Sequence, residues 1–260
     1  MKYTPKYFKE NLPEWKRKKD PPTSRIIYRP LSFVTASLAA NLGISANAIS
    51  YFSIILALFA CICFVIPNYT VNILGAVFVN IWLLSDCTDG NIARSVKKQP
   101  FGDFADSISS YILVGLLCTC MGVCTYFQGG VLVSQYNMWI VVIGALASSS
   151  DTLMRLIYQK YKASERMLAD NNILSIEEDK RTNNANVNSL RVRIESDLGI
   201  GGILPILILI GILIKALDLV LIYCFLYYGA SCLVCSLMYV LKAIKRTKQV
   251  EENQKEMEKK

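Results

Sequence analysis

The sequence contains no histidine, and only 18% of its 260 residues are charged. Without histidine the chain lacks the commonest general base and metal ligand of proteins, so any proton transfer must use carboxylates or bound water. The few charges accompany 53% hydrophobic residues and a mean hydropathy of +0.36, which is too apolar for a soluble domain of this length. The chain is therefore expected to be an integral membrane protein.

Polar loops with paired cysteines are also missing. All nine cysteines lie within or beside apolar runs, which argues against both a disulfide framework and a zinc cluster and favours small buried hydrophobes. The net charge of +8 comes from basic residues that border the apolar runs. A membrane surface explains these residues better than nucleic acid does, so no nucleic-acid partner is expected.

Long apolar runs predict an all-α membrane fold with six spanning helices, since each run approaches the roughly 20 residues that cross a bilayer. A shorter run at 31–44 predicts a cytoplasmic, interfacial amphipathic helix before the first span. The fifth predicted span is short, and only a small polar island at 215–218 separates it from the sixth. The six predicted spans are 48–66, 71–94, 103–127, 136–161, 198–214 and 217–244.

The distribution of lysine and arginine predicts the orientation. With six spans, every one of the 28 basic residues except Lys215 falls on the same side, which places both termini and the stretch 86–110 in the cytoplasm. The chain then divides into a basic N-terminal segment (1–30), a membrane domain (31–244) and a charged helical tail (245–260). Within the membrane domain, 162–197 is a polar insert, interpreted as a linker in preference to a lid over the site.

The stretch 86–110 contains four aspartates, and three of them, Asp86, Asp89 and Asp106, stand out at the edge of apolar segments, where charge is costly and usually functional. Asp86 and Asp89 share one helical face, and Asp106 lies on the next helix with Ser110 one turn further. Three converging carboxylates cannot all stay ionised without a cation. Oxygen ligands alone favour Mg²⁺ or Mn²⁺, which typically serve phosphate chemistry, in some proteins as a pair of ions about 4 Å apart.

Glycine and arginine near these carboxylates also suit a phosphate ligand. Gly90 lets a ligand approach the backbone, and Arg94, one turn later, has the forked geometry that binds phosphate. Gly102 opens the following helix, whose N-terminal end favours anions.

The stretch resembles the signature of the CDP-alcohol phosphotransferase (CDP-alcohol phosphatidyltransferase) family, D-x2-D-G-x2-A-R, seven or eight residues, then G-x3-D-x3-D. The family's interfacial helix and six spans extend the resemblance over most of the chain. A weaker family pattern, Pro-Asn followed by Thr, is echoed by Ala46-Asn47 and Ser50. The matching signature positions are Asp86, Asp89, Gly90, Ala93, Arg94, Gly102 and Asp106.

The resemblance implies a function and a set of roles. Asp86, Asp89 and Asp106 would bind the metals, Gly90, Ala93 and Gly102 would lie close to the CDP moiety, and Arg94 would contact its phosphates. An acceptor hydroxyl would attack the β-phosphate of a CDP-linked alcohol or CDP-lipid and release CMP, as in phospholipid or related lipid biosynthesis. The family also suggests a homodimer.

Ser110 departs from the signature, because the family has its fourth aspartate there, which serves as second-metal ligand and presumed base. Asp103, on a similar helical face, is one candidate for the missing carboxylate. A metal-bound water or the substrate phosphate could take the proton instead. Alternatively, the protein has lost activity and only binds nucleotide or lipid.

Other charged residues leave further alternatives open. Asp151 and Arg155, four residues apart, either pair with each other or help to hold the acceptor. Arg29 and other basic residues beside the membrane are interpreted as positive-inside anchors. A cation transporter would need its aspartates near the bilayer midplane, whereas these lie at the cytoplasmic edge. The acceptor itself has no readable motif, which leaves inositol phosphate, glycerol phosphate, serine, a diacylglycerol or a glycan-linked hydroxyl open.

Overall fold

A computed structural model describes residues 2–171, 173–175 and 197–258, and within these ranges the regular structure is helical. Five helices are long and apolar enough to cross a membrane: α4 (Ala46–Val65), α5 (Tyr69–Ser95), α6 (Gly102–Gln128), α7 (Trp139–Asp170) and α10 (Leu217–Glu258). The shorter elements are α1 (Pro5–Glu10), α2 (Glu14–Lys19), the π-helix η1 (Ser24–Tyr28), α3 (Arg29–Asn41) and α9 (Leu204–Leu213).

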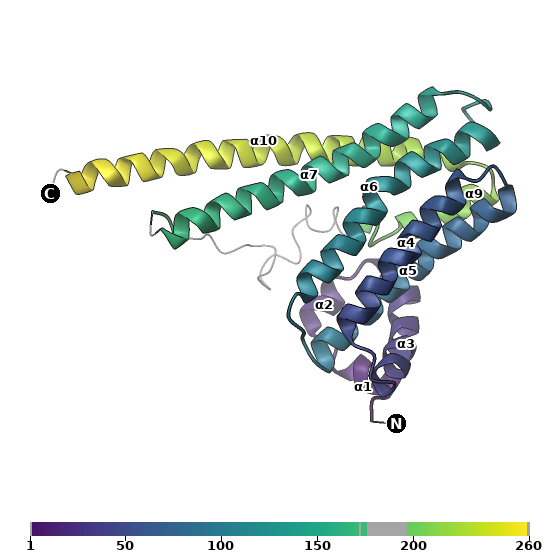
Figure 1. The fold of residues 1–260 in the computed structure, drawn as a ribbon, viewed down its shortest axis with the longest axis horizontal. Helices are drawn as coiled ribbons and strands as arrows, with labels where there is room; N and C mark the ends of the chain where they lie inside the picture. The colour runs from purple at the N-terminus through teal and green to yellow at the C-terminus, as the bar shows by residue number, and fades with distance from the viewer. Residues whose placement is uncertain (1, 172, 176–196, 259–260) are drawn as a thin grey trace.

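The long helices form a bundle in which α4 packs against α5 and α6, α6 against α7, and α7 against α10 (Figure 1). Glycines allow the close approach of α6 and α7, because a methyl group at Gly144 would lie 2.3 Å from the Cys118 carbonyl oxygen. Beyond this contact, α7 and α10 run together away from α3, α4 and α5 (Figure 1). The α7–α10 pair therefore diverges from α3, α4 and α5 (Figure 1).

The end of the bundle where α5 stops and α6 starts is called here the signature end. The N-terminal segment is attached to it, since the Tyr7 hydroxyl donates a hydrogen bond to the Ser95 carbonyl oxygen (2.7 Å). At the opposite end, Asp218 near the start of α10 accepts backbone hydrogen bonds from Leu132 and Val133 (2.6 and 3.2 Å). α10 starts at this opposite end and runs beside α7 to the C-terminus (Figure 1).

The predicted fifth span is much shorter than expected. Its helix, α9, has 10 residues and a length of about 15 Å, roughly half a bilayer core. Gly199, Gly201 and Gly202 lie in the turns before it, and Pro205 stands in its first turn. Glycine disfavours a helix interior and proline favours a helix start, so the helix begins at Leu204 and the six-span count is not confirmed.

The remaining predicted segments match in part. A helix covers most of 31–44, but it starts at Arg29 and ends at Asn41, and its position at a membrane surface stays a prediction. The first residues of the predicted insert at 162–197 are helical, because α7 continues to Asp170. Residues 172 and 176–196 of that insert lie outside the described residues. The tail is helical as far as Glu258 and continues α10 without a break.

Candidate active site

The connection between α5 and α6 is held by the start of α4. The Asn47 backbone N–H donates to Gln99 Oε1 (3.0 Å), and the Asn47 side-chain amide donates to the Pro100 carbonyl oxygen (2.9 Å). Phe101 then takes a left-handed backbone conformation with φ of 57° directly before α6. These contacts fix where the two signature helices meet.

The three predicted metal ligands lie near this connection, with different exposure. Asp89 is 5% exposed, and its Oδ2 accepts a hydrogen bond from the Ser50 hydroxyl (2.6 Å). Asp86 is half-buried and Asp106 is exposed. Asp86 and Asp106 lie on α5 and α6, on either side of the connection between these two helices. The adjacent ends of α5 and α6 thus bring these carboxylates into one acidic cluster.

The donor set of this cluster suits a hard divalent cation, since every candidate ligand atom is a carboxylate or hydroxyl oxygen. Ser50 orients Asp89 in the way that outer hydrogen bonds commonly orient metal ligands. However, no group of three or more His, Cys, Asp and Glu among the described residues is arranged closely enough to hold a metal ion. The chemistry of the residues fits such an ion, while their arrangement is more open than a finished ligand cage.

Arg94 and Gly90 are in direct contact. The Arg94 guanidinium folds back over Gly90, where a methyl group would lie 2.8 Å from Arg94 Nη2. Arg94 also donates to Asn91 Oδ1 (3.3 Å) and remains exposed. Ala93, in contrast, packs against the apolar cluster that contains Phe8. Glycine at position 90 therefore makes room for the arginine side chain as well as for any ligand.

Arg29 is not a surface anchor, contrary to the sequence interpretation. It is 6% exposed and forms a two-pronged ion pair with Asp20, with distances of 2.6 and 3.0 Å. Its Nη1 also donates to the Cys87 carbonyl oxygen (3.4 Å) and to Asn91 Oδ1 (3.2 Å). Arg29 therefore connects the N-terminal segment to the turn of α5 that carries Asp86 and Asp89.

The charge state of Asp20 reflects two opposing effects. Burial raises the pKa of the Asp20 carboxyl, whereas the hydrogen bonds from Arg29 and the positive charge of Lys16 lower it, and the net pKa lies below the ordinary value. The Asp20 carboxylate is thus well stabilised in its charged form. Sequence reasoning missed this pair, because a separation of nine residues across two prolines carries no helical spacing signal.

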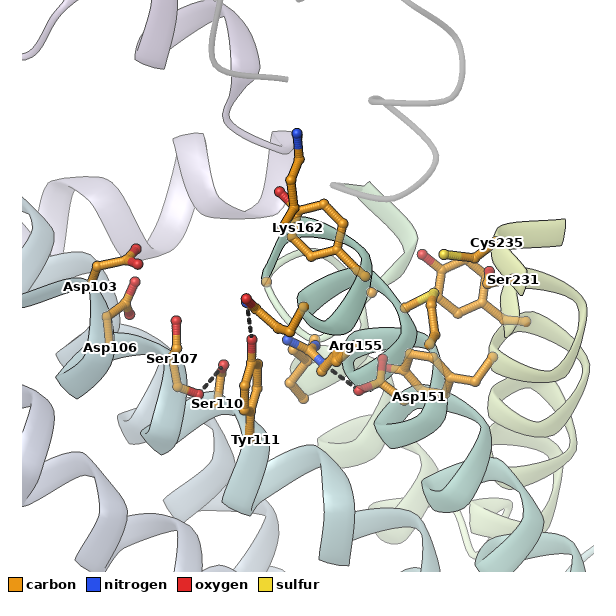
Figure 2. Close-up of a pocket in the computed structure, with 18 of the residues that line it drawn as sticks. Asp103, Asp106, Ser107, Ser110, Tyr111, Asp151, Arg155, Lys162, Ser231 and Cys235 are labelled. Atoms are coloured by element: carbon orange, nitrogen blue, oxygen red, sulfur yellow. Dashed lines mark hydrogen bonds and ion pairs between the residues drawn. The ribbon is translucent and has the colours of Figure 1, made fainter. Parts of the chain in front are cut away.

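A cavity of about 560 Å³ opens between α6, α7 and α10. Asp103 and Asp106 lie side by side at one end of it, and Ser107 and Ser110 follow along α6 (Figure 2). The Ser110 hydroxyl donates to the carbonyl oxygen of Ser107 (2.9 Å). The fourth signature position thus lines the cavity without a carboxylate, while Asp103 does supply one at the same end.

Asp151 and Arg155 pair with each other, as one of the two alternatives predicted, and a role in holding the acceptor stays a prediction. They form an ion pair within α7, and both line the same cavity as Asp106 (Figure 2). Asp151 is 1% exposed, so its charge is balanced mainly by Arg155. The sequence spacing predicted the pair, but only the packing of α6 against α7 shows that it faces Ser110.

Taken together, these features define an integral membrane helical bundle with an acidic cluster beside a large polar cavity. The family model for CDP-alcohol phosphatidyltransferase matches residues 43–176, about half of the chain, and the protein belongs to this family. The match covers the signature and the whole of α4, α5, α6 and α7. No curated protein sequence matches the chain.

Family membership supports some general statements. The protein is a membrane transferase of phospholipid metabolism that uses a CDP-alcohol donor and a hydroxyl acceptor. Members of the family generally use divalent metals. The match identifies neither a particular donor nor a particular acceptor.

Proposed function

We propose that the protein transfers a substituted phosphate group from a CDP-linked alcohol to an acceptor hydroxyl at the cluster of Asp86, Asp89 and Asp106. The acceptor oxygen forms a new bond to the β-phosphorus, and the bond from the β-phosphorus to the bridging oxygen breaks, so that CMP leaves. The acceptor proton passes to a base. The observation that carries this proposal is the family match over 43–176, together with the position of Asp106, which lines a cavity large enough for a substrate.

Asp86, Asp89 and Asp106 would hold Mg²⁺ or Mn²⁺, which when bound neutralises charge on the phosphates. Ser50 holds the Asp89 carboxylate in one orientation through its hydrogen bond. Arg94 lies exposed one turn beyond Gly90, where its guanidinium can contact the donor phosphates. The chain therefore contributes positioning and balanced charge, the two things that phosphoryl transfer chiefly requires.

Ser110 cannot serve as the base that accepts the acceptor proton, and Asp103 is the best candidate for this role. It lines the cavity at the same end as Asp106, and it is exposed, so an acceptor hydroxyl can reach its carboxylate. The Ser110 hydroxyl already donates to Ser107 and has a poor capacity to take up a proton. A second metal ion, if present, would lack its usual fourth carboxylate here.

The orientation and assembly complete the proposal. With six spans, both termini and the acidic cluster face the cytoplasm, because every basic residue except Lys215 then falls on that side. The segment 1–30, the domain 31–244 and the tail 245–260 form one membrane unit, which is compatible with a homodimer. Membrane lipids surround the bundle and supply the lipid-bearing substrate.

The test is CMP release by the purified protein in detergent or nanodiscs. A panel of CDP-alcohols and CDP-lipids is combined with hydroxyl acceptors and Mg²⁺ or Mn²⁺, with EDTA in a parallel series. We expect CMP release with at least one pair, and its loss in EDTA. CMP from no pair would instead favour the alternative, a family member that binds nucleotide or lipid without turnover because position 110 is serine.

A further inference from the structure

The far end of the cavity differs in character from the acidic end. It lies between α7 and α10, where Asp151, Arg155 and Ser231 face the same space as Ser110 on α6 (Figure 2). Most of the residues that line the cavity carry a hydroxyl, an amide or a charge. Such walls suit a polar molecule and do not suit the acyl chains of a diacylglycerol.

Tyr228, on α10, is the strongest indication of a ligand. Its side chain lines the cavity and is 3% exposed, yet its hydroxyl has no hydrogen-bond partner among the described residues. Buried polar atoms nearly always have a partner, and leaving one without a partner is costly. The ring packs edge-on against Tyr227, with ring centroids 5.0 Å apart. The hydroxyl itself is covered, and a polar ligand bound against this wall would supply its missing partner.

The charges beside Tyr228 are already balanced. Arg155 pairs with Asp151, and its guanidinium lies over the Tyr111 ring at 5.1 Å from the centroid. Gln159 donates to the Tyr111 hydroxyl (3.0 Å), so this wall is fixed by its own hydrogen bonds. The wall thus presents aromatic faces and polar edges with little net charge. Lys162, which pairs with Glu165 (2.8 Å), and Arg166 line the same cavity, so a phosphate on the acceptor also finds basic groups there.

We infer that this end of the cavity binds the acceptor, and that the acceptor is a polyhydroxylated ring, a cyclic polyol or a sugar. Several hydroxyls on one ring can donate to and accept from Tyr228, Gln159 and Asp151, while an apolar ring face lies against a tyrosine. The inference rests on the proposed function, since the reacting hydroxyl must reach the Asp103–Asp106 end. It assigns to Tyr228 a specificity-determining contact that no signature position provides.

Two substrate sources share this chemistry, the free polyol and its phosphate ester. The test therefore compares initial rates of CMP release with myo-inositol, glucose and their monophosphates, and with serine, glycerol phosphate and dioleoylglycerol. Each acceptor is combined with every CDP-alcohol of the donor panel. We expect the highest rates with a ring polyol or its phosphate, and the preference between these two identifies the source.

Tyr228→Phe removes only the hydroxyl and supplies the second readout. Loss of one hydrogen bond to the acceptor is expected to raise the acceptor KM about three- to tenfold, with an unchanged donor KM. Tyr51→Phe, on the exposed face of α4 and outside the cavity, is the matched control and is expected to leave both constants unchanged. Unchanged thermal unfolding of Tyr228→Phe would show that the variant is folded.

The outcomes distinguish a failure of the polyol assignment from a failure of the proposed function. CMP release that prefers serine, glycerol phosphate or dioleoylglycerol, or an acceptor KM unaffected by Tyr228→Phe, overturns the polyol assignment and leaves the transferase intact. If none of the acceptors gives CMP release, the proposed function itself is overturned.

Discussion

Replacing Asp20 by asparagine tests whether the N-terminal segment holds the signature turn of α5. Asp20 and Arg29 are 5% and 6% exposed, and the substitution leaves the Arg29 charge buried without its counter-ion. Breaking a buried ion pair from one side typically costs about 3–5 kcal/mol. Asparagine can still accept one hydrogen bond, so we expect a loss of about 3 kcal/mol in the free energy of unfolding.

The assay is denaturant unfolding in mixed detergent micelles, followed by helical circular dichroism. Glu14→Gln is the matched control, because Glu14 pairs with Lys18 on the surface at 2.7 Å and its loss should leave stability unchanged. Exchange of both partners for apolar residues of similar size, Asp20→Leu with Arg29→Met, should recover most of the loss. A decrease below about 1 kcal/mol for Asp20→Asn would refute the reasoning.

The same pair predicts a pH dependence. The pKa of Asp20 is lower in the folded protein than the value of about 3.9 expected for the unfolded chain. Its contribution to stability is therefore complete above about pH 4 and is lost as the pH falls through the lower, folded pKa. Between these values the wild type should lose stability more steeply than Asp20→Asn, and parallel curves would contradict the assignment.

The remaining predictions concern the bundle and the acidic cluster. Gly144→Ala puts a methyl group 2.3 Å from the Cys118 carbonyl oxygen and should destabilise the protein by about 1–3 kcal/mol in thermal unfolding, whereas an unchanged midpoint would contradict the close packing. Ser50→Ala removes the hydrogen bond to Asp89 and should raise the Mg²⁺ concentration needed for half-maximal CMP release about 10–100-fold. Ser110→Asp should raise the rate of CMP release if a carboxylate base limits it, and a lower rate would show that serine suits this site.

The spanning helices were predictable because each one is a continuous apolar run, which membrane burial forces into a helix. The fifth predicted span was not confirmed, and the reason is local. Hydropathy counts 198–214 as one apolar segment, yet Gly199, Gly201 and Gly202 disfavour helix before Pro205, so only the remainder is helical. Glycine and proline positions thus carried a signal that hydropathy alone does not use.

The acidic cluster was predictable because its residues lie on two helices joined by a short turn, so spacing alone brings them together. The residues that surround this cluster and the cavity were not predictable. Arg29 donates to the Cys87 carbonyl oxygen 58 residues further along the chain, and Tyr228 on α10 lines the same cavity as α6. Neither position follows from a periodic pattern in the sequence. Such contacts depend on the packing of distant helices, which the sequence of a single chain does not reveal.

The most direct test of the proposed function is the rate of CMP release by Asp89→Asn beside the wild type. Asp170→Asn, an exposed carboxylate at the end of α7, is the matched control. Loss of a group that organises charge at the transferred phosphate should lower the rate by about a hundredfold or more, with the control unchanged. CMP release by Asp89→Asn at the wild-type rate would contradict the assignment of the active site.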